Sequence, residues 1–261
     1  MANTKALISW PVDVAFRPER LVSVDTADEG RGVGWAVIEG TRLTALYSVN
    51  LVMYAAPLTL AGYGVVEATH APEAVAPLLE SLVGDAGSAW QLLVSLGFNG
   101  AFLLVGTLLT FGTFHVGILL SGASSGVLQS LRAVTYSTGI YLAVMYTLVW
   151  YVAMSPAMAV AEKILLTLQG QFFYYFIDMF NSTLELPGGR PDAVDATGLS
   201  GPEQFVLILL FLSATYFLYV LYVGARVGHN ANRIQALIAT GIVLVSPALY
   251  VIGTILFSLY T

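Results

Sequence analysis

Residues 92–120 read LLVSLGFNGAFLLVGTLLTFGTFHVGILL, 29 residues without one charged side chain. The uncharged run is longer still, since no Asp, Glu, Lys or Arg occurs between Asp85 and Arg132. About 20 apolar helical residues are enough to cross the roughly 30 Å hydrocarbon layer of a bilayer. We therefore expect a membrane-spanning helix here, and this expectation decides the fold class.

Four further stretches repeat this pattern, at 43–66, 133–154, 205–223 and 234–259, with Pro57 inside the first and Pro247 inside the last. The whole chain is 57% hydrophobic and only 10% charged, against about 25% charged residues in soluble domains. We expect an all-α polytopic membrane protein with five transmembrane helices. Residues 1–42 would form an N-terminal segment, and residues 43–261 a five-helix membrane domain.

The basic residues predict the orientation, because Lys and Arg concentrate in cytoplasmic loops. With the N-terminus inside and the C-terminus outside, eight basic residues lie on the inner side and two on the outer side. The inner residues are Lys5, Arg17, Arg20, Arg31, Arg42, Arg132, Arg226 and Arg233, and the outer ones are Lys163 and Arg190. Six spans would give a less asymmetric distribution.

The outer loop at 155–204 contains the segment hardest to interpret, residues 157–184. It mixes charges with the aromatic run 172–176, and an interfacial helix is favoured over a sixth span. The triplet Asn181-Ser182-Thr183 makes Asn181 a candidate glycosylation acceptor on the outer side.

Several kinds of chemistry are not expected. The chain has no cysteine and no basic patch for nucleic acid, and its three histidines lie far apart in the sequence. Ser124 and Ser125, with His115, have the residue types of a membrane hydrolase, but a tight turn of small residues explains these serines better. We expect no catalytic, cofactor or metal site, and no enzyme activity.

Small residues within the spans indicate close helix packing. Gly97 and Ala101 are spaced for it in the second span, and Gly224 and Gly228 form a GxxxG pair near the end of the fourth. No charged residue lies near the centre of a span, which weighs against a pump, since intramembrane charges mark ion pathways.

The stretch 114–122, FHVGILLSG, leads into an apolar-Arg-apolar-apolar-x-Tyr run at 131–136. This segment resembles the best-marked segment of the Ypt-interacting (YIP) family of membrane proteins. The resemblance covers about 25 residues and marks four positions, His115, Gly122, Arg132 and Tyr136. It implies five clustered spans and a cytosolic N-terminus.

The resemblance also implies a role. Eukaryotic members look like adaptors in membrane traffic, and prokaryotic members resemble accessory subunits of envelope systems. Few lysines, abundant acids and no cysteine indicate a salt-adapted organism. We expect a plasma-membrane scaffold or accessory subunit whose partners are lipids and other integral membrane subunits.

Two alternatives stay open. The first is a small-solute or lipid permeation protein, in which Asn50, Asn99 and His115 would face a water-lined path. The second concerns Arg132, which would either bind a lipid phosphate or serve as an ordinary positive-inside residue.

Overall fold

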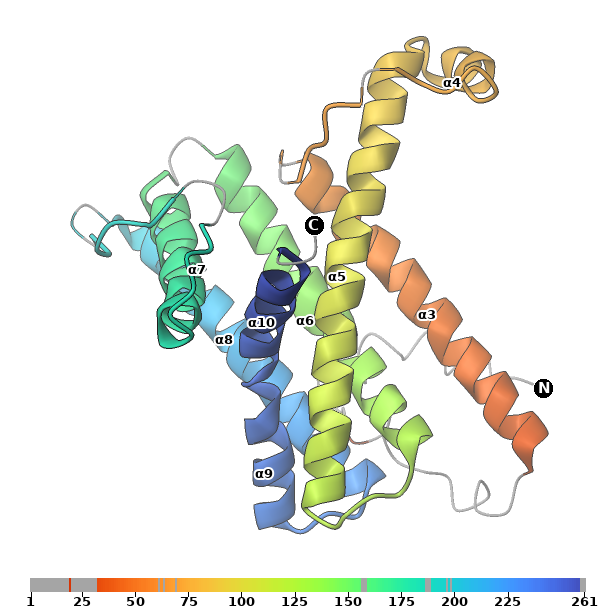
Figure 1. The fold of residues 1–261 in the computed structure, drawn as a ribbon, viewed down its shortest axis with the longest axis vertical. Helices are drawn as coiled ribbons and strands as arrows, with labels where there is room; N and C mark the ends of the chain where they lie inside the picture. Colours follow the sequence, from red (N-terminus) through yellow and green to blue (C-terminus); the bar gives the residue numbers. More distant parts are fainter. Residues whose placement is uncertain are drawn as a thin grey trace.

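The computed structural model describes residues 19, 32–60, 62, 64–68, 70–155, 159–185, 189–195, 197 and 199–258 of the 261-residue chain. Within these residues all regular structure is helical (Figure 1). The helices are α3 (Val33–Leu60), α4 (Ala76–Val83), α5 (Ala86–Leu120), α6 (Val127–Met154), α7 (Ala159–Met179), α8 (Gly201–Val223), the π-helix η3 (Gly224–Gly228), α9 (Arg233–Val243) and α10 (Ser246–Ser258).

Four helical stretches of the described chain are long and apolar enough to cross a membrane: Val33–Leu60, Ala86–Leu120, Gly201–Gly228 and Arg233–Phe257. The prediction of a helical membrane protein is confirmed at this level. The expected span at 133–154 coincides with α6, which is helical over 28 residues but is not one of these four. Its first half carries many polar side chains.

Two helices begin earlier than the uncharged runs predicted. Helix α3 starts at Val33, ten residues before the expected span, and includes the charged residues Glu39 and Arg42. The helix therefore extends across the expected division after residue 42, which separated an N-terminal segment from the membrane domain. Most of residues 1–42 lies outside the described residues. Helix α5 starts at Ala86, after Asp85, whose carboxylate accepts a hydrogen bond from the backbone N–H of Gly87.

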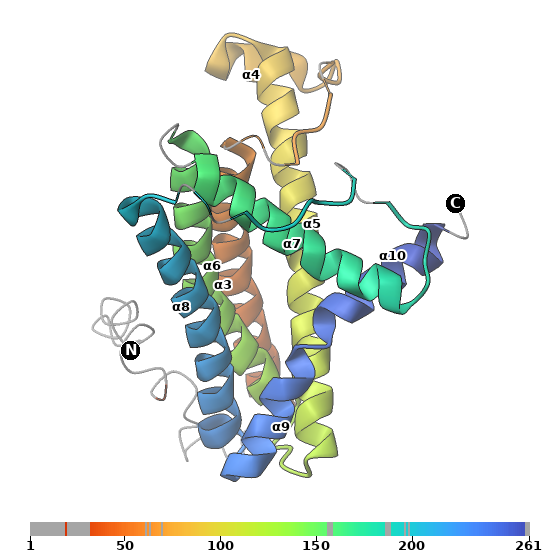
Figure 2. The same cartoon turned by 90° about the vertical axis from the view of Figure 1, so that its left-hand side faces the viewer.

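The long helices run in alternating directions, since α3 and α6 rise in Figure 1 while α5 and α8 descend. Helix α6 packs against both α3 and α8, and the three lie side by side in Figure 2. Helix α5 packs against α3 and α9. We call the end of the bundle where α5 ends and α6 begins the lower end. It also contains the starts of α3 and α9 (Figure 1).

The chain leaving α3 is held against α5 by two buried polar residues. The side-chain amide of Asn99 donates to Thr59 Oγ1 at 2.9 Å, and the backbone N–H of Val66 donates to Ser95 Oγ at 3.0 Å. Gly64, at φ +59°, lies directly against Asn99 and has no room for a side chain. Helix α5, at 35 residues or about 52 Å, reaches beyond these contacts to α4 (Figure 1).

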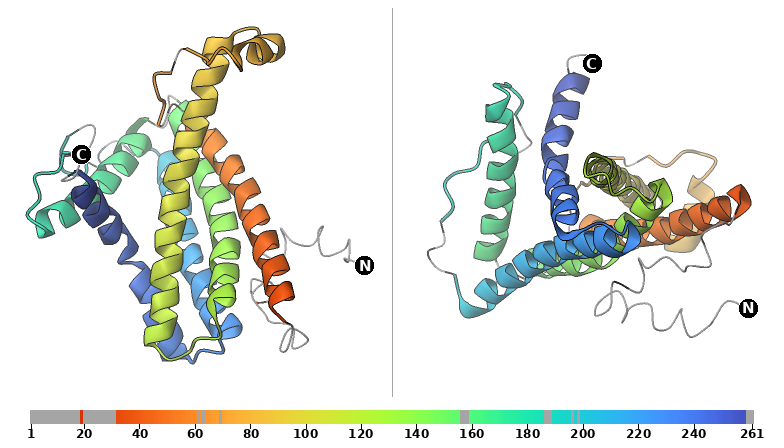
Figure 3. Two further views of the ribbon diagram at one scale, coloured as in Figure 1. Left: turned by 45° about the vertical axis from the view of Figure 1, so that its right-hand side comes forward. Right: turned by 90° about the horizontal axis from the view of Figure 1, so that it is seen from below.

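The expected last span, 234–259, is broken into two helices. Helix α9 ends at Val243 and α10 begins at Ser246, immediately before Pro247. Proline has no N–H to donate to the carbonyl of Val243 one turn earlier, and its ring crowds that carbonyl. The two helices therefore meet at a bend, and α10 departs from the bundle to lie beside α7 (Figure 3).

Helix α7 occupies most of the segment in which an interfacial helix was expected, and it crosses the upper part of the bundle obliquely (Figure 2). Tyr174 and Ile177 of α7 are buried against Val251 of α10. At its end, the exposed carboxylate of Asp178 pairs with Arg190, which also lies over the ring of Tyr174. The Arg190 guanidinium lowers the pKa of Asp178, through its hydrogen bonds first and its charge second.

The main core lies at the lower end and contains the turn from α8 through η3 to α9. Phe114 and Ile118 of α5, Ala133 and Val134 of α6, and Ala239 of α9 are among its fully buried residues. The closest helix contact is at Gly117, where an added Cβ would lie 2.8 Å from the Cα of Ala239. Only glycine at this position allows α5 and α9 to pack so closely.

Candidate functional site

The first three turns of α6 carry the densest group of buried polar side chains in the described part of the chain. They connect α6 to α3 on one side and to α5 and the η3–α9 turn on the other. Of the four positions marked by the family resemblance, Arg132 and Tyr136 lie in these turns, His115 lies on α5 and Gly122 lies in the turn that joins the two helices. The buried polar residues of these turns are Gln129, Ser130, Arg132, Thr135, Ser137 and Thr138.

A buried ion pair connects α6 to α3. Arg132 Nη2 lies 2.9 Å from Glu39 Oε1, and the side chains are only 8% and 7% exposed. Arg42 binds the second oxygen, Glu39 Oε2, at 3.1 Å and donates to the hydroxyl of Tyr136 at 3.1 Å. Two cations therefore bind one carboxylate, the phenol of Tyr136 binds one of those cations, and the group carries a net charge of +1.

The geometry bears on the interpretations of Arg132. Its guanidinium is buried and paired with Glu39, so in this structure it is not presented to a lipid phosphate. Arg42 is the exposed cation of the group, with 64% of its side chain exposed beside the same carboxylate.

A second network connects α6 to α5 and to the turn before α9. Ser130 Oγ lies 2.8 Å from His115 Nδ1 and 3.1 Å from His229 Nε2. The backbone N–H of Ser125 donates to the other nitrogen, His229 Nδ1, at 3.1 Å. The rings also pack on aromatics, His115 parallel to Phe111 and His229 tilted against Phe114.

The Ser125 contact fixes the direction of this hydrogen-bond chain. A backbone N–H can only donate, so His229 Nδ1 must accept and carries no proton. The neutral ring then carries its proton on Nε2 and donates it to Ser130 Oγ. Ser130 is left with its own proton, which it donates to His115 Nδ1. Each contact is satisfied when His229 is neutral and His115 accepts at Nδ1.

Burial of His229 agrees with this assignment. The ring is 2% exposed, and burial, followed by the nearby His115, lowers its pKa from 6.5 to about 4. A proton added at Nδ1 would face the N–H of Ser125 and break that hydrogen bond. The network is therefore a structural connection that is stable at neutral pH.

The turn between α5 and α6 depends on glycine. Gly122 has φ +72° and follows the last turn of α5. Its N–H donates to Leu119 O, and that of Ala123 donates to Ile118 O, the two bonds of a Schellman motif. Gly126, at φ +106°, begins α6. This agrees with the expectation of a tight turn at 122–126.

The small residues singled out in the sequence lie in different environments. Gly224 and Gly228 are buried in η3, within the contacts to α6 and α9. Gly97 and Ala101 are exposed on α5, and nothing lies within 4 Å of a Cβ added at Gly97. The pair on α5 therefore has no close partner within the described residues.

Asn181 has a backbone role in addition to its place in the glycosylation triplet. It is exposed, has φ +49° and follows the end of α7. Its N–H donates to Asp178 O, and that of Ser182 donates to Ile177 O, which is again a Schellman motif. Asparagine tolerates this left-handed conformation better than most residues.

Sequence reasoning missed Glu39, Arg42, Ser130 and His229 as members of these networks. The sequence did contain a signal for the ion pair. Glu39 and Arg42 stand at the edge of one apolar run, and Arg132 stands at the edge of another. His115 contacts Ser130 and not the hydroxyls of Ser124 or Ser125. Ser130 itself is fully buried, and the described residues contain no group of three metal-binding side chains.

The fold and these networks define the class of the protein: an all-helical membrane protein whose lower end is held together by buried polar connections between helices. No protein-family model matches the chain, and no curated protein or solved structure matches it either.

Proposed function

We propose that the chain is a five-span protein of the plasma membrane, with its lower end in the cytoplasm, and that it serves as a non-enzymatic scaffold or accessory subunit of a larger membrane complex. The resemblance to the YIP family is part of this proposal. The four marked positions make structural contacts at one end of the bundle. Such contacts are expected of a sequence motif that holds the helices of a scaffold protein in a fixed arrangement.

The arrangement of α6 supports five spans. It is 28 residues long, or about 42 Å, and lies between α3 and α8. If α3 and α8 span the bilayer, α6 spans it with them. The alternating directions of the long helices then place the start of α3 and the end of α10 on opposite sides.

Charge supports the orientation and the place of α7. The parts of α3, η3, α6 and α9 at the lower end contain Arg42, Arg132, Arg226 and Arg233 and one acid, Glu39. Lys163 and Arg190 lie toward the other end, with most of the acids. The oblique course of α7 and its exposed aromatics, Phe172 and Tyr175, favour an interfacial helix over a sixth span.

The observation that carries the functional proposal is that polar groups of the spans bind other helices. Asn99 donates to Thr59, and His115 contacts Ser130, so two of the three residues proposed for a water-lined path have protein partners. The third, Asn50, is buried on α3, and its side-chain nitrogen has no hydrogen-bond partner within the described residues. A scaffold needs such fixed connections between helices, whereas a permeation path needs polar groups that face water.

A helix of a partner protein would bind between α3 and α5. There the spans form an apolar groove of about 320 Å³ that includes Gly97, Gly100 and Ala101. Small residues at such a surface let a second backbone approach closely, which is how helices associate in lipid.

Cross-linking in native membranes tests this proposal. The chain has no cysteine, so Ala101→Cys introduces a single thiol in the groove, and Phe211→Cys introduces one on the exposed face of α8 as the control. We expect a short thiol-reactive cross-linker to give one adduct of defined mass at position 101 and none at position 211. No adduct at either position, together with solute flux through proteoliposomes of the purified chain, would favour the permeation alternative.

A further inference from the structure

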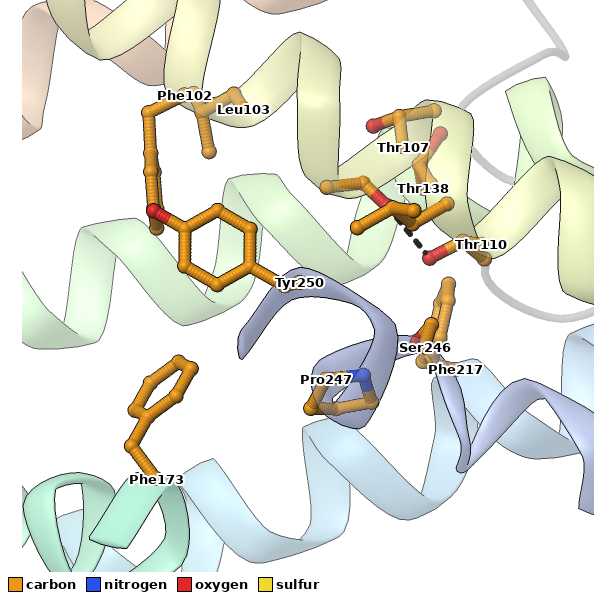
Figure 4. A pocket seen from close by; sticks show the side chains of 12 residues that line it. Phe102, Leu103, Thr107, Thr110, Thr138, Phe173, Phe217, Ser246, Pro247 and Tyr250 are labelled. Carbon is orange, nitrogen blue, oxygen red and sulfur yellow. Dashed lines mark hydrogen bonds between the residues drawn. The ribbon is translucent and has the colours of Figure 1, made fainter. Parts of the chain in front are cut away.

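A cavity of about 280 Å³ lies where the last span is broken. It is lined by residues of five helices, with Ser246, Pro247 and Tyr250 of α10 on one side (Figure 4). The bend at Pro247 keeps α10 from continuing along α9 and leaves this space beside α5. Gly106 borders the cavity about 21 Å from the end of α5, within a helix long and apolar enough to cross a membrane.

The wall of the cavity has two kinds of surface and no charge. Aromatic rings form one part: Phe102 and Phe173 meet Tyr250 edge-on, with ring centroids 5.8 and 6.1 Å apart. Hydroxyl groups form the other part, and they come from Thr107, Thr110, Thr138 and Ser246 (Figure 4). The absence of charged residues from this lining selects against ions, because nothing would offset their desolvation.

The hydroxyl groups of Thr110 and Thr138 offer hydrogen-bond acceptors to a ligand in the cavity. Thr110 donates its proton to the carbonyl of Gly106 at 3.0 Å, and Thr138 donates to the carbonyl of Val134 at 2.8 Å. Because those protons are used within the helices, the oxygens offer only lone pairs to a ligand. A molecule that hydrogen-bonds to Thr110 or Thr138 must therefore supply the donor.

The cavity also borders the outer surface of the bundle. Phe102 and Gly106 are exposed on α5, in a stretch apolar enough to cross the membrane. A molecule dissolved in the bilayer can therefore reach the cavity from the side. The volume equals that of about nine water molecules, which accommodates roughly ten carbon or oxygen atoms, or the end of a longer chain.

We propose that this cavity binds a neutral, apolar alcohol from the bilayer, with its hydroxyl donating to Thr110 or Thr138 and its hydrocarbon part against Phe102, Phe173 and Tyr250. A short isoprenoid alcohol has the required size, donor and lack of charge. An ether of the same length has no donor, and a carboxylate of the same length carries a charge that the wall does not compensate.

The test uses the full-length protein in phosphatidylcholine nanodiscs and a diazirine derivative of a ten-carbon isoprenoid alcohol as the photolabel. Geraniol, its methyl ether and the geranate anion compete at matched membrane concentrations. We expect labelled peptides from α5 and α10. We expect geraniol to compete about five- to tenfold better than the ether, the gain typical of one hydrogen bond, and geranate not to compete. Equal competition by all three would overturn the proposal.

Variants then locate the site. Gly106→Phe places a ring in the cavity and should reduce labelling at least tenfold. Gly112→Phe, on the same helix and also with nothing within 4 Å of an added Cβ, should not. The double variant Thr110→Val and Thr138→Val keeps the volume; it should bind the alcohol photolabel about five- to tenfold more weakly and lose the preference for geraniol over the ether. Unchanged labelling of Gly106→Phe, or an unchanged preference in the threonine variant, would contradict the assignment.

Discussion

Replacing Glu39 by methionine should destabilise the protein more than replacing Arg132, although the two form one ion pair. The reason is the third member of the group. In Glu39→Met, the buried guanidinium of Arg132, 8% exposed, loses its carboxylate. In Arg132→Met, Glu39 keeps a cation, because Arg42 still binds its second oxygen at 3.1 Å.

The expected magnitudes follow from burial. Leaving one member of a buried ion pair uncompensated costs about 3–5 kcal/mol, and this range applies to Glu39→Met. For Arg132→Met we expect a loss of about 1–3 kcal/mol of stability. The loss is smaller because Glu39 keeps its ion pair with Arg42, although that pair is weakened by the exposure of Arg42 to solvent. The double variant Glu39→Met and Arg132→Met removes both buried charges and should lie within about 1 kcal/mol of the wild type, as apolar replacements of buried pairs often do.

Unfolding of the purified protein in detergent, followed by tryptophan fluorescence, measures these differences. At about 2–4 °C per kcal/mol for a chain of this size, Glu39→Met should lower the midpoint by about 6–20 °C. Arg190→Met, which removes the exposed pair with Asp178, is the control and should leave the midpoint unchanged. A double variant no more stable than Glu39→Met, or equal effects of the two single variants, would refute the reasoning.

Three further predictions concern other contacts. Folding lowers the pKa of His229 from 6.5 to about 4, so between these pH values the unfolded chain binds a proton that the folded chain does not. The contribution of His229 to stability should therefore be complete above pH 6.5 and be lost as the pH falls toward 4. The unfolding midpoint should fall less between pH 7 and pH 5 in His229→Gln than in the wild type. Gly117→Ala forces a Cβ against Ala239 and should cost about 1–3 kcal/mol, whereas Gly112→Ala, with open space, should cost nothing in the same unfolding assay. Asn181→Ala should cost about 1 kcal/mol and Asn181→Gly nothing, because only alanine is strained at φ +49°; equal midpoints for these two would contradict the left-handed assignment.

The helical class and most span positions could be predicted because apolar runs of 20 or more residues admit few structures in a bilayer. The differences from the prediction lie where a contact between distant residues determines where a helix begins or bends. Helix α3 begins ten residues before the uncharged run, and Glu39 in this extension pairs with Arg132 of a distant helix. The last span breaks at Pro247, and whether a proline bends or breaks a helix depends on the neighbours that satisfy the freed carbonyl.

The site was predictable only in part for the same reason. His115 and Arg132 stood out as polar residues at the edges of apolar runs, but their partners are 15 and 93 residues away along the chain. Ser130, the centre of the histidine network, has no local pattern that distinguishes it from Ser124 or Ser125. Its role follows from the close packing of α5, α6 and the turn before α9, which the small residues at Gly117 and Ala239 allow.

The most direct test of the scaffold account is the intact mass of the protein released from its native membrane in a mild detergent and measured by native mass spectrometry. The account predicts a complex heavier than the 27.8 kDa chain, containing a second integral membrane protein in fixed proportion. A single chain of 27.8 kDa, observed alone in several detergents and in native nanodiscs, would contradict it.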